Sequence, residues 1–398
     1  MDADVAAAAT PWLTPGVRGI GTASFLADVG HEIPTALLPD LLTKTLGAPA
    51  SALGLIEGIS DGLAGAARVG GGVLADDPSR RRSVAVGGYT TTAVLAATSG
   101  AATATWQVGI LRAGAWTARG LRVPARNALL ADVVEPTAYG RAYGFERAMD
   151  NLGAIVGPLL AVGLVAAFGT RTAIGLSVLP GLAAAVAIVY AIRHTTTIRD
   201  RPRIPIRLKV RPVLAAPGLG RLFAGVTAFE LGNAAATLLI LRATDLLEPG
   251  RSHDRAVTIA IGLYVAYNAA ATLTSLLVGR MIDRHGARHG LVLGAAAFAV
   301  AYLGLTVDTT SWVALAPWFV LAGVGIGCAE TAEHAAIASA APEQVRGSAF
   351  GLLAGIQSLG NVAASAVAGI LWTAFSPSWA FTYLGIAMVA ATALLLRR

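Results

Sequence analysis

Hydrophobic residues along the chain are grouped in long blocks, and the short polar segments between the blocks carry most of the basic side chains. The blocks have roughly 20 to 28 residues, the length of α-helix needed to cross a hydrocarbon core about 30 Å thick. This pattern predicts an all-α membrane protein. Its twelve spanning helices are expected near residues 17–43, 50–75, 83–104, 106–124, 141–167, 171–193, 217–243, 256–279, 288–307, 311–337, 344–372 and 378–396.

The composition agrees with this pattern. Of 398 residues, 55% are hydrophobic and only 13% are charged, about half the charged share that is usual in soluble domains. The net charge of +7 does not indicate a nucleic-acid partner, because the basic residues lie between the hydrophobic blocks and few aromatic residues accompany them. The one cysteine, Cys328, lies inside a hydrophobic block, so neither an intramolecular disulfide nor a cysteine metal site is expected.

The distribution of arginine between the blocks predicts the orientation of the chain. Residues 80–82 are all arginine, Arg280, Arg284 and Arg288 surround the loop after the eighth block, and segment 194–216 is rich in basic residues. The opposite loops are nearly free of them. Because basic loops stay in the cytoplasm and an even number of spans returns the chain to the same side, both termini are expected to be cytoplasmic. The chain is then a multi-pass protein of the inner (plasma) membrane.

Two sequence segments repeat at one offset. The stretch GGVLADDPSRRR aligns with VGRMIDRHGARH so that Asp76 falls on Asp283, an offset of 207 residues, and the same offset carries AYGFERAMDNLG onto AFGLLAGIQSLG. Unrelated stretches that share an offset indicate a duplication. We therefore expect a six-helix half over residues 1–193, a cytoplasmic linker over 194–216 and a second six-helix half over 217–398. Transporters built this way bind substrate between their halves and rock one half against the other.

The repeated loops resemble the signature of the major facilitator superfamily, a glycine followed by an aspartate and a basic cluster. The chain is similar to that family over essentially its full length, although Ser79 replaces the second glycine in the first loop. The resemblance implies that these loops latch the cytoplasmic side through the aspartate, nearby arginines and a facing helix terminus, which attracts a carboxylate. The gating residues expected from the two loops are Gly72, Asp76, Arg81, Gly279, Asp283 and Arg288.

The fifth block contains a second resemblance. Gly153, Gly157, Pro158 and Gly163 are similar to the antiporter motif of bacterial proton-coupled efflux permeases. The repeat offset puts Ala364 and Ser365 in place of Gly157 and Pro158. The resemblance implies export and a gating role for Gly157 and Pro158. The alternative is an ordinary glycine-rich packing face with a proline bend.

Titratable residues lie inside the first two blocks. Asp28, His31 and Glu32 occupy one helical face, and Glu57 and Asp61 repeat the spacing of four residues in the second block. Each charge at the centre of a bilayer costs about 2.5–3.5 kcal/mol on insertion scales. These faces are therefore expected to turn toward an internal cavity.

Proton coupling is the chemistry we expect from these groups. A carboxylate that is alternately buried and paired with an arginine can load and release a proton. Asp28 and Glu32 are the first candidates, followed by Asp61, with Glu57 and His31 in the same set. Arg112 in the fourth block matches the intramembrane arginine of the family, and the resemblance implies that it takes part in proton coupling. The alternative is a fixed network of ion pairs that only orients the helices.

The fourth block continues with a stripe of arginines. Arg119, Arg122 and Arg126 follow Arg112 at spacings that keep all four within roughly 80° of one helical face. Such a stripe requires acids, water or an anionic substrate. Arg122 and Arg126 lie beside Pro124 and are expected to be anchors at the cytoplasmic edge. The expected substrate-binding residues are Arg119, Glu146, Asp150, Glu230, Asn233, Tyr267, Asn268, Gln357 and Asn361.

The acids and arginines are concentrated in the first half, so the second half is expected to be the more neutral, substrate-binding one. Its tenth block carries Glu330, Glu333 and His334 on one face. Together with His31 these side chains could bind a divalent metal, but a gate or an ion pair is the preferred interpretation and no metal is expected. The chain has no G-x-x-x-x-G-K-[ST] motif, so the proton gradient rather than ATP or a cofactor is the expected energy source.

The sequence thus predicts a proton-coupled antiporter that exports a small organic molecule and works as a monomer, with substrate, protons and lipid as its partners. Three alternatives stay open. An importer of an organic anion would use the arginine stripe as a clamp. A divalent-metal exporter would depend on His31 or His334. An intramembrane enzyme would use Asp28, His31 and Glu32, but it would leave the duplicated loops without a purpose, so we expect no enzymatic activity.

Overall fold

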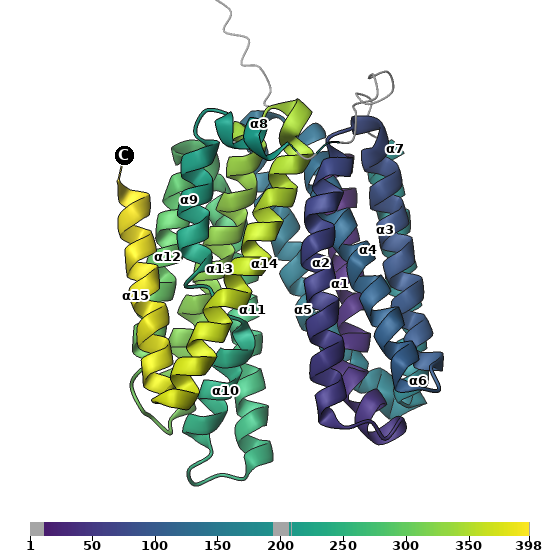
Figure 1. The fold of residues 1–398 in the computed structure, drawn as a ribbon, viewed down its shortest axis with the longest axis vertical. Coiled ribbons are helices and arrows are strands. Elements are labelled where there is room, and N and C mark those ends of the chain that lie inside the picture. The colour runs from purple at the N-terminus through teal and green to yellow at the C-terminus, as the bar shows by residue number, and fades with distance from the viewer. Residues whose placement is uncertain (1–11, 194–206, 208, 398) are drawn as a thin grey trace, which may run out of the picture.

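The computed structural model describes residues 12–193, 207 and 209–397, and every regular element in this part of the chain is a helix. Figure 1 shows two pseudo-symmetric bundles of long helices side by side. The first bundle contains α1 (Pro15–Asp40), α2 (Ala50–Ala75), α3 (Pro78–Thr98), α4 (Thr105–Asp132), α5 (Tyr139–Phe168), α6 (Thr170–Leu176) and α7 (Val178–Arg193). The second contains α9 (Leu219–Glu230), α10 (Ala236–Leu247), α11 (His253–His285), α12 (Ala287–Gly304), α13 (Trp312–Ala340), α14 (Arg346–Ala374) and α15 (Pro377–Leu396).

Short elements complete the chain. A π-helix follows α1 over Leu41–Thr45, and 3₁₀ turns cover Ser99–Ala101, Pro136–Ala138 and Glu343–Val345. The segment expected as a linker contains a short helix, α8 (Val210–Ala215), while residues 194–206 and 208 of that segment lie outside the described residues. The end of the molecule that bears α8 is called the latch end below, and the opposite end, near α6 and α10, is called the open end (Figure 1).

Each of the twelve expected spans coincides with one long helix or with two consecutive shorter ones. By length and hydropathy alone, seven helical segments qualify as membrane spans: Pro136–Phe168, Thr170–Arg193, His253–His285, Ala287–Gly304, Trp312–Ala340, Glu343–Ala374 and Pro377–Leu396. Most of the others carry charged residues that turn toward the interior, or are divided by a break.

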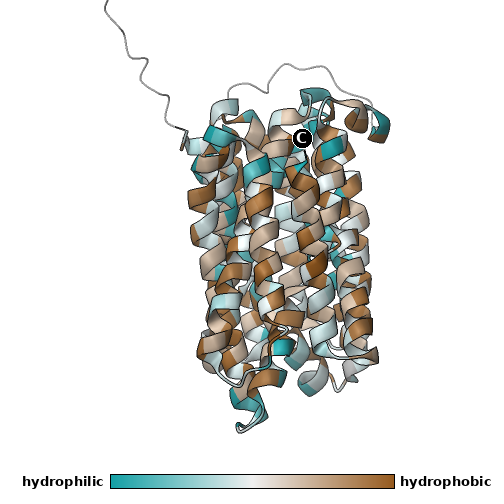
Figure 2. Ribbon diagram, turned by 90° about the vertical axis from the view of Figure 1, so that its left-hand side faces the viewer, coloured by the Kyte–Doolittle hydropathy of each residue, from teal (hydrophilic) through white to brown (hydrophobic). Residues whose placement is uncertain are grey.

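The outer surface is suited to lipid. Large aliphatic side chains such as Leu55, Ile110, Leu277 and Leu359 are more than half exposed, and Figure 2 shows hydrophobic residues along the length of the outer helices. An exposed apolar surface of this extent is unfavourable in water and marks contact with a membrane.

Capping side chains and prolines define several helix starts. Thr14 Oγ1 accepts a hydrogen bond from Val17 N (3.3 Å) just before Pro15 begins α1. Asp77 Oδ1 accepts one from Ser79 N (2.9 Å) just before Pro78 begins α3. A side-chain acceptor at the N-cap followed by proline is a favourable helix start, because proline has no N–H to leave unsatisfied.

The span expected over 217–243 is divided, which corrects the prediction of one continuous helix. α9 ends at Glu230, and α10 begins at Ala236. Side chains of α14 satisfy the backbone freed by this break: Ser365 Oγ accepts from Ala235 N (2.9 Å), and Asn361 Nδ2 donates to Asn233 O (2.9 Å). Irregular backbone at this depth is tolerated where protein partners replace the missing helical hydrogen bonds.

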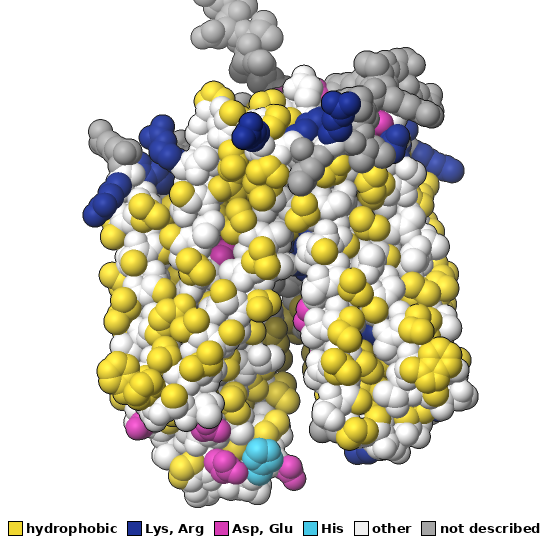
Figure 3. Space-filling model, in the orientation of Figure 1, with side chains coloured by type: hydrophobic (Ala, Val, Ile, Leu, Met, Phe, Trp, Pro, Cys, Tyr) yellow, Lys and Arg dark blue, Asp and Glu magenta, His cyan; other side chains and the backbone are white. Residues whose placement is uncertain are grey.

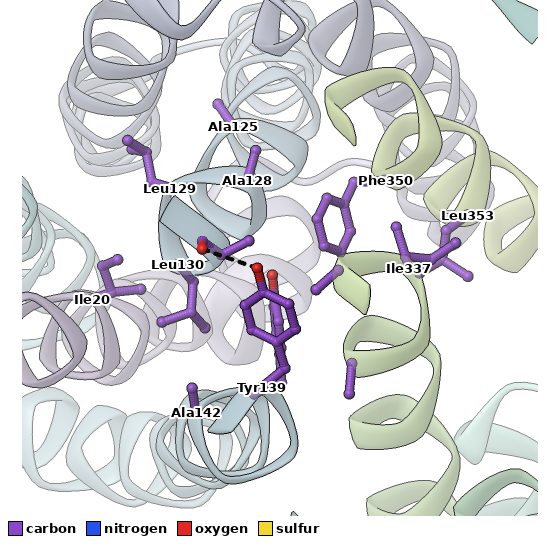
Figure 4. Packing of buried hydrophobic residues seen from close by; sticks show 14 of the residues in the cluster. Ile20, Ala125, Ala128, Leu129, Leu130, Tyr139, Ala142, Ile337, Phe350 and Leu353 are labelled. Atoms are coloured by element: carbon purple, nitrogen blue, oxygen red, sulfur yellow. Dashed lines mark hydrogen bonds between the residues drawn. The ribbon is translucent and has the colours of Figure 1, made fainter. Parts of the chain in front are cut away.

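α4 extends beyond the predicted end at residue 124, which is a second correction. Pro124 lies inside the helix, which continues to Asp132. Figure 4 shows Ala125, Leu129 and Leu130 of this extension packed with Tyr139 in the buried cluster at the junction of the bundles. Tyr139 Oη donates to Ala131 O (3.4 Å). Packing of the extension therefore offsets the unfavourable proline, and Arg126 is carried into the bundle.

Candidate functional site

A cavity of about 400 Å³ lies between the two bundles. Figure 3 shows the cleft between them, which opens toward the open end of the molecule. Charged side chains from the first bundle line it: Asp28, Asp61, Arg68, Arg119, Arg122, Arg126, Arg147 and Asp150. The second bundle contributes Glu230, Asn233, Glu330, His334, Gln357, Ser358 and Asn361.

Asp28 and Arg119 form an ion pair in the wall of this cavity. Arg119 Nη2 lies 3.0 Å from Asp28 Oδ1. Asp28 is only 5% exposed, whereas about a quarter of the Arg119 side chain (23%) remains accessible. The arginine is therefore the partner that can also reach a molecule in the cavity.

Glu146 does not line the cavity, which corrects its prediction as a substrate-binding residue. It is 0% exposed and lies between two guanidinium groups, with Arg126 Nη1 at 2.8 Å and Arg147 Nε at 2.7 Å. Ser24 Oγ donates to it at 2.6 Å. A fully buried carboxylate requires such partners, so Glu146 holds α1, α4 and α5 together.

Arg122 and Arg126 are also placed differently from the expectation of cytoplasmic-edge anchors. They are 3% and 4% exposed and both line the cavity. The Arg122 guanidinium lies over the Tyr89 ring, 4.1 Å from its centroid. Arg126 approaches Asp150 at 3.5 Å. The longer α4 brings both arginines inside the bundle.

The other expected proton-coupling residues gather around one indole, that of Trp116. The Arg112 guanidinium lies 3.4 Å from the centroid of this ring, and the His31 ring contacts it at a tilt of 36° with centroids 4.2 Å apart. Trp116 Nε1 donates to Asp61 Oδ1 (2.7 Å). Arg112 also pairs with Glu57 at 2.8 Å. The sequence analysis did not include Trp116, although it is four residues after Arg112 and therefore on the same helical face.

Glu32 lies at the edge of this group. Its side chain is 25% exposed and its carboxylate is 4.0 Å from His31 Nε2. α5 packs directly against Glu32: a Cβ added to Gly157 would lie only 2.5 Å from Glu32 Cβ. Gly157 thus permits the close approach of α1 and α5, and Pro158 follows inside α5.

The second bundle is more acidic at the cavity than expected. Glu330 and His334 line it, and Glu333 accepts a hydrogen bond from Gln357 Nε2 (2.7 Å). Glu230, the last residue of α9, accepts one from Asn233 Nδ2 (3.0 Å). The second bundle still contributes fewer charged groups to the cavity than the first, as expected of the more neutral half, but these groups are mainly acids.

Tyr267 and Asn268 lie outside the cavity lining, contrary to their prediction as substrate-binding residues. Tyr267 stacks on Tyr264 with centroids 5.6 Å apart, and Asn268 Nδ2 donates to Tyr264 O (3.1 Å). α13 covers this face of α11, because a Cβ on Gly323 would lie 2.1 Å from Tyr267 O. At Tyr267 and Asn268, α11 therefore packs against α13 and does not face the cavity.

Two contacts cross the cavity between the bundles, and the sequence analysis did not anticipate either. Arg68 Nη1 donates to Ser358 Oγ, and Arg147 Nη1 lies 3.7 Å from Glu330 Oε2. Because each contact involves one residue from each bundle, both must change when the bundles move relative to one another.

At the latch end, Asp76 and Asp283 each reach the first turn of a helix in the opposite bundle. Asp76 accepts from Ser348 N (2.8 Å) and Ser348 Oγ (2.6 Å) at the start of α14. Asp283 accepts from Gly140 N (2.6 Å) and from Arg141 Nε (2.6 Å) at the start of α5. The two contacts are equivalent under the repeat and use the favourable electrostatics of a helix N-terminus.

Glycines permit the backbones to touch beside these contacts. A Cβ on Gly72 would lie 2.6 Å from Gly347 O, and a Cβ on Gly279 would lie 2.5 Å from Gly140 O. Both distances are shorter than a side chain tolerates. The latch end is therefore closed backbone against backbone.

The two arginines predicted as gating residues differ in position. Arg81 is 0% exposed; it pairs with Asp132 at 2.6 Å and donates across the bundles to Glu343 O (3.4 Å). Arg288 instead donates to Leu395 O (2.6 Å) and Leu396 O (2.5 Å), within the second bundle. Arg288 therefore attaches the end of α15 and does not reach the first bundle.

Comparisons with known proteins agree with this architecture. The model of the Major Facilitator Superfamily matches residues 20–247 and 251–398. An uncharacterized protein of Mycobacterium tuberculosis is 30% identical over 362 residues, covering 89% of this chain and 86% of that protein. The class G tetracycline resistance protein of Vibrio anguillarum is 24% identical over 255 residues, 63% of each chain. Among solved structures, the human organic anion transporter MFSD10 superimposes with a TM-score of 0.75 at 15% identity, covering 97% of this chain and all (100%) of that one.

Proposed function

This chain belongs to the major facilitator superfamily, and we propose that it is a proton-coupled antiporter that exports a small organic molecule from the cytoplasm by alternating access. It is a membrane transporter and not an enzyme. The ion pair of Asp28 with Arg119 in the cavity wall carries the proposal.

This pair can couple two cargoes by competition. Arg119 holds the Asp28 carboxylate at 3.0 Å and remains partly accessible to the cavity. A substrate donor group that binds the deprotonated Asp28 carboxylate displaces Arg119 from it, whereas a proton on Asp28 removes the negative charge that holds the substrate, so proton and substrate exclude one another. Because the two loaded forms alternate at one site, substrate and proton move in opposite directions.

The group around Trp116 is the proposed proton route to Asp28. Glu57 and Glu32 have side chains that are 31% and 25% exposed, and His31 lies between Glu32 and the indole. His31 Nδ1 has no hydrogen-bond partner among the described residues. These side chains form a series of proton carriers along the inner face of α1 and α2.

The proposed direction rests on the orientation and on the relatives. The latch end bears the arginines of residues 80–82 and of the loop with Arg280, Arg284 and Arg288. Because basic loops stay in the cytoplasm, this end is assigned to the cytoplasm. The cavity then opens to the outside, and both termini are cytoplasmic in the inner membrane. The Gly157–Pro158 motif in α5 and the similarity to a tetracycline resistance protein favour export.

The Asp76 and Asp283 contacts are the proposed gate on the cytoplasmic side. They hold the two bundles together at the latch end while the cavity is open to the outside. Substrate uptake from the cytoplasm requires both to break. We expect the protein to work as a monomer, without a bound metal or cofactor, with lipid and substrate as partners.

The test is an exchange assay in liposomes that contain an internal pH dye, with a panel of small organic molecules as substrates. Proton movement opposite to the substrate is expected in the wild type and is expected to be lost in Asp28→Asn. Asp308→Asn, which removes an exposed partner of Arg242 at the open end, is the matched control. Unaltered coupling in Asp28→Asn would contradict the assignment of the coupling site.

An importer of an organic anion is the second candidate, because five arginines line the cavity: Arg68, Arg119, Arg122, Arg126 and Arg147. In the same assay it predicts that proton and substrate move in the same direction. A divalent-metal exporter has less support, since the described residues contain no group of three or more histidine, cysteine or acidic side chains arranged to hold a metal ion.

A further inference from the structure

Among the charged groups that line the cavity without an ion-pair partner in the described part of the chain are Arg68 and Arg122 of the first bundle and Glu230 of the second. We propose that the substrate is a dipolar organic molecule, with an anionic group bound by Arg68 and Arg122 and a protonated amine bound by Glu230. This inference rests on the proposed transport function and names the class of substrate.

Arg122 is the clearest unpaired cation. It is 3% exposed and lines the cavity. Its guanidinium contacts the face of Tyr89 at 4.1 Å, and its Nε has no hydrogen-bond partner among the described residues. The nearby Asp28 is already paired with Arg119. A buried guanidinium with a free donor is a strong site for a carboxylate or phosphate.

Arg68 supplies a second cation on the same side. It projects from α2 and donates to the neutral hydroxyl of Ser358, and no carboxylate in the described part of the chain lies within ion-pair distance of it. A hydroxyl satisfies one donor of the guanidinium but does not neutralise its charge. Arg68 and Arg122 therefore form the anion-binding side of the cavity.

Glu230 is the unpaired anion on the opposite side. It is 3% exposed and lines the cavity, and within the described part of the chain it accepts one hydrogen bond, from the neutral Asn233 amide. It is also the last residue of α9, where the partial negative charge of the helix C-terminus opposes a carboxylate. α14 fixes its position, because a Cβ on Gly360 would lie 2.4 Å from Glu230 Cβ. A buried carboxylate in this setting requires a cation or a proton from the cavity.

A molecule with both charges satisfies both sides at once. A singly charged molecule would leave either Glu230 or the pair of arginines unmatched. Arg68 and Arg122 belong to the first bundle and Glu230 to the second. A dipolar substrate therefore also bridges the two bundles, which must move relative to one another during transport. The cavity of about 400 Å³ is near the lower end of the range for pockets that bind drug-sized ligands, so the substrate is a small molecule.

The experiment measures binding by thermal unfolding of the purified full-length protein in detergent. The probes are amphoteric aromatic amino acids, each compared with its methyl ester, which keeps only the amine charge, and its N-acetyl derivative, which keeps only the carboxylate. We expect zwitterions to stabilise the wild type at concentrations at least tenfold lower than either derivative. Glu230→Gln should abolish this advantage over the N-acetyl derivative, and Arg122→Gln should abolish it over the ester.

Residues of the same types that do not line the cavity provide the controls, Glu248→Gln and Arg251→Gln, which should bind like the wild type. If Arg122→Gln does not fold, Arg68→Gln tests the same side. The proposal is overturned if no zwitterion stabilises the protein, if the derivatives stabilise it equally well, or if Glu230→Gln keeps the wild-type preference. No proton gradient is present in this assay, so the absence of a zwitterion preference would not contradict proton antiport. Likewise, loss of antiport in the liposome assay would not contradict the zwitterion preference.

Discussion

Arg147 of α5 and Glu330 of α13 form an ion pair across the two bundles, with 3.7 Å between the guanidinium Nη1 and the carboxylate Oε2. The same guanidinium lies 2.7 Å from Glu146 and 3.2 Å from Asp150. One arginine therefore joins the buried acids of the first bundle to an acid of the second, on the wall of the cavity.

Glu330→Gln should favour separation of the bundles at the latch end. The pair is partly exposed and contributes about 1 kcal/mol, so the ratio of closed to separated forms should fall roughly fivefold. Distances between spin labels at Ser83→Cys and Arg284→Cys, in a Cys328→Ser background, measure this ratio. Asp308→Asn is the control, since its ion pair with Arg242 lies within the second bundle. An unchanged distance distribution would contradict the assignment.

Gly72→Ala should prevent closure of the latch end. The added Cβ would lie 2.6 Å from Gly347 O, and overpacking of this kind costs about 1–3 kcal/mol. The bundles can relieve the contact by separating, so the variant should fold but lose transport. Gly62→Ala lies on the same helix with nothing within 4 Å of the added Cβ and should behave as the wild type. Equal transport by the two variants would rule out the backbone contact as part of the gate.

Glu146→Gln should destabilise the protein more than Asp150→Asn. Glu146 is fully buried between Arg126 and Arg147, and removal of one partner from a buried ion pair costs about 3–5 kcal/mol. The Asp150 side chain is 19% exposed at the cavity, so Asp150→Asn should lower the free energy of unfolding by only about 1 kcal/mol. Thermal unfolding in detergent measures both. Similar losses in the two variants would indicate that Glu146 has no special structural role.

Ser79→Ala should reduce stability in a pH-dependent manner. Burial raises the pKa of Asp77, but hydrogen bonds from Ser79 Oγ and N and the neighbouring Arg80 outweigh it, so the pKa lies below the usual 3.8. A lowered folded-state pKa contributes stability above the unfolded value of 3.8, and this contribution is lost as the pH falls through the folded value.

The difference in free energy of unfolding between the wild type and Ser79→Ala should therefore be about 1 kcal/mol at pH 7 and should shrink progressively below about pH 4. Ser83→Ala is the control, because the Ser83 hydroxyl donates only to the backbone oxygen of Arg80 (2.9 Å). A difference that stays constant down to strongly acidic pH would show that the hydroxyl does not act through the Asp77 charge.

The hydropathy pattern was enough to locate the membrane-spanning segments, but it did not show where their helices end or are interrupted. Pro124 suggested the end of a helix, yet packing of Leu129 and Leu130 in the buried core extends α4 to Asp132. The opposite error occurred at Ala235, where the hydropathy pattern continues but the helix is interrupted and Ser365 of α14 accepts the freed backbone N–H. In both places a neighbouring helix decides the outcome.

The site was predictable where one helical face collects charges. Asp28 and Arg119 were expected to face an internal cavity, and both line it. Arg68, Glu330 and His334 line it as well, although the sequence analysis assigned none of them to the substrate site. Helical periodicity identifies a face, but the height and rotation of that face against a partner helix depend on packing.

The sequence by itself determined the number and order of the spanning segments, the internal repeat and the two aspartates of the latch, because hydropathy and motif spacing are properties of neighbouring residues. Only the tertiary structure decided which charges are paired. Arg119 and Asp28 are 91 residues apart in the chain, and Ser24 and Glu146 are 122 apart. Burial requires each charge to find a counter-charge or a hydrogen bond, and the packed bundle supplies these to Glu146 while it leaves Arg122 and Glu230 without an opposite charge.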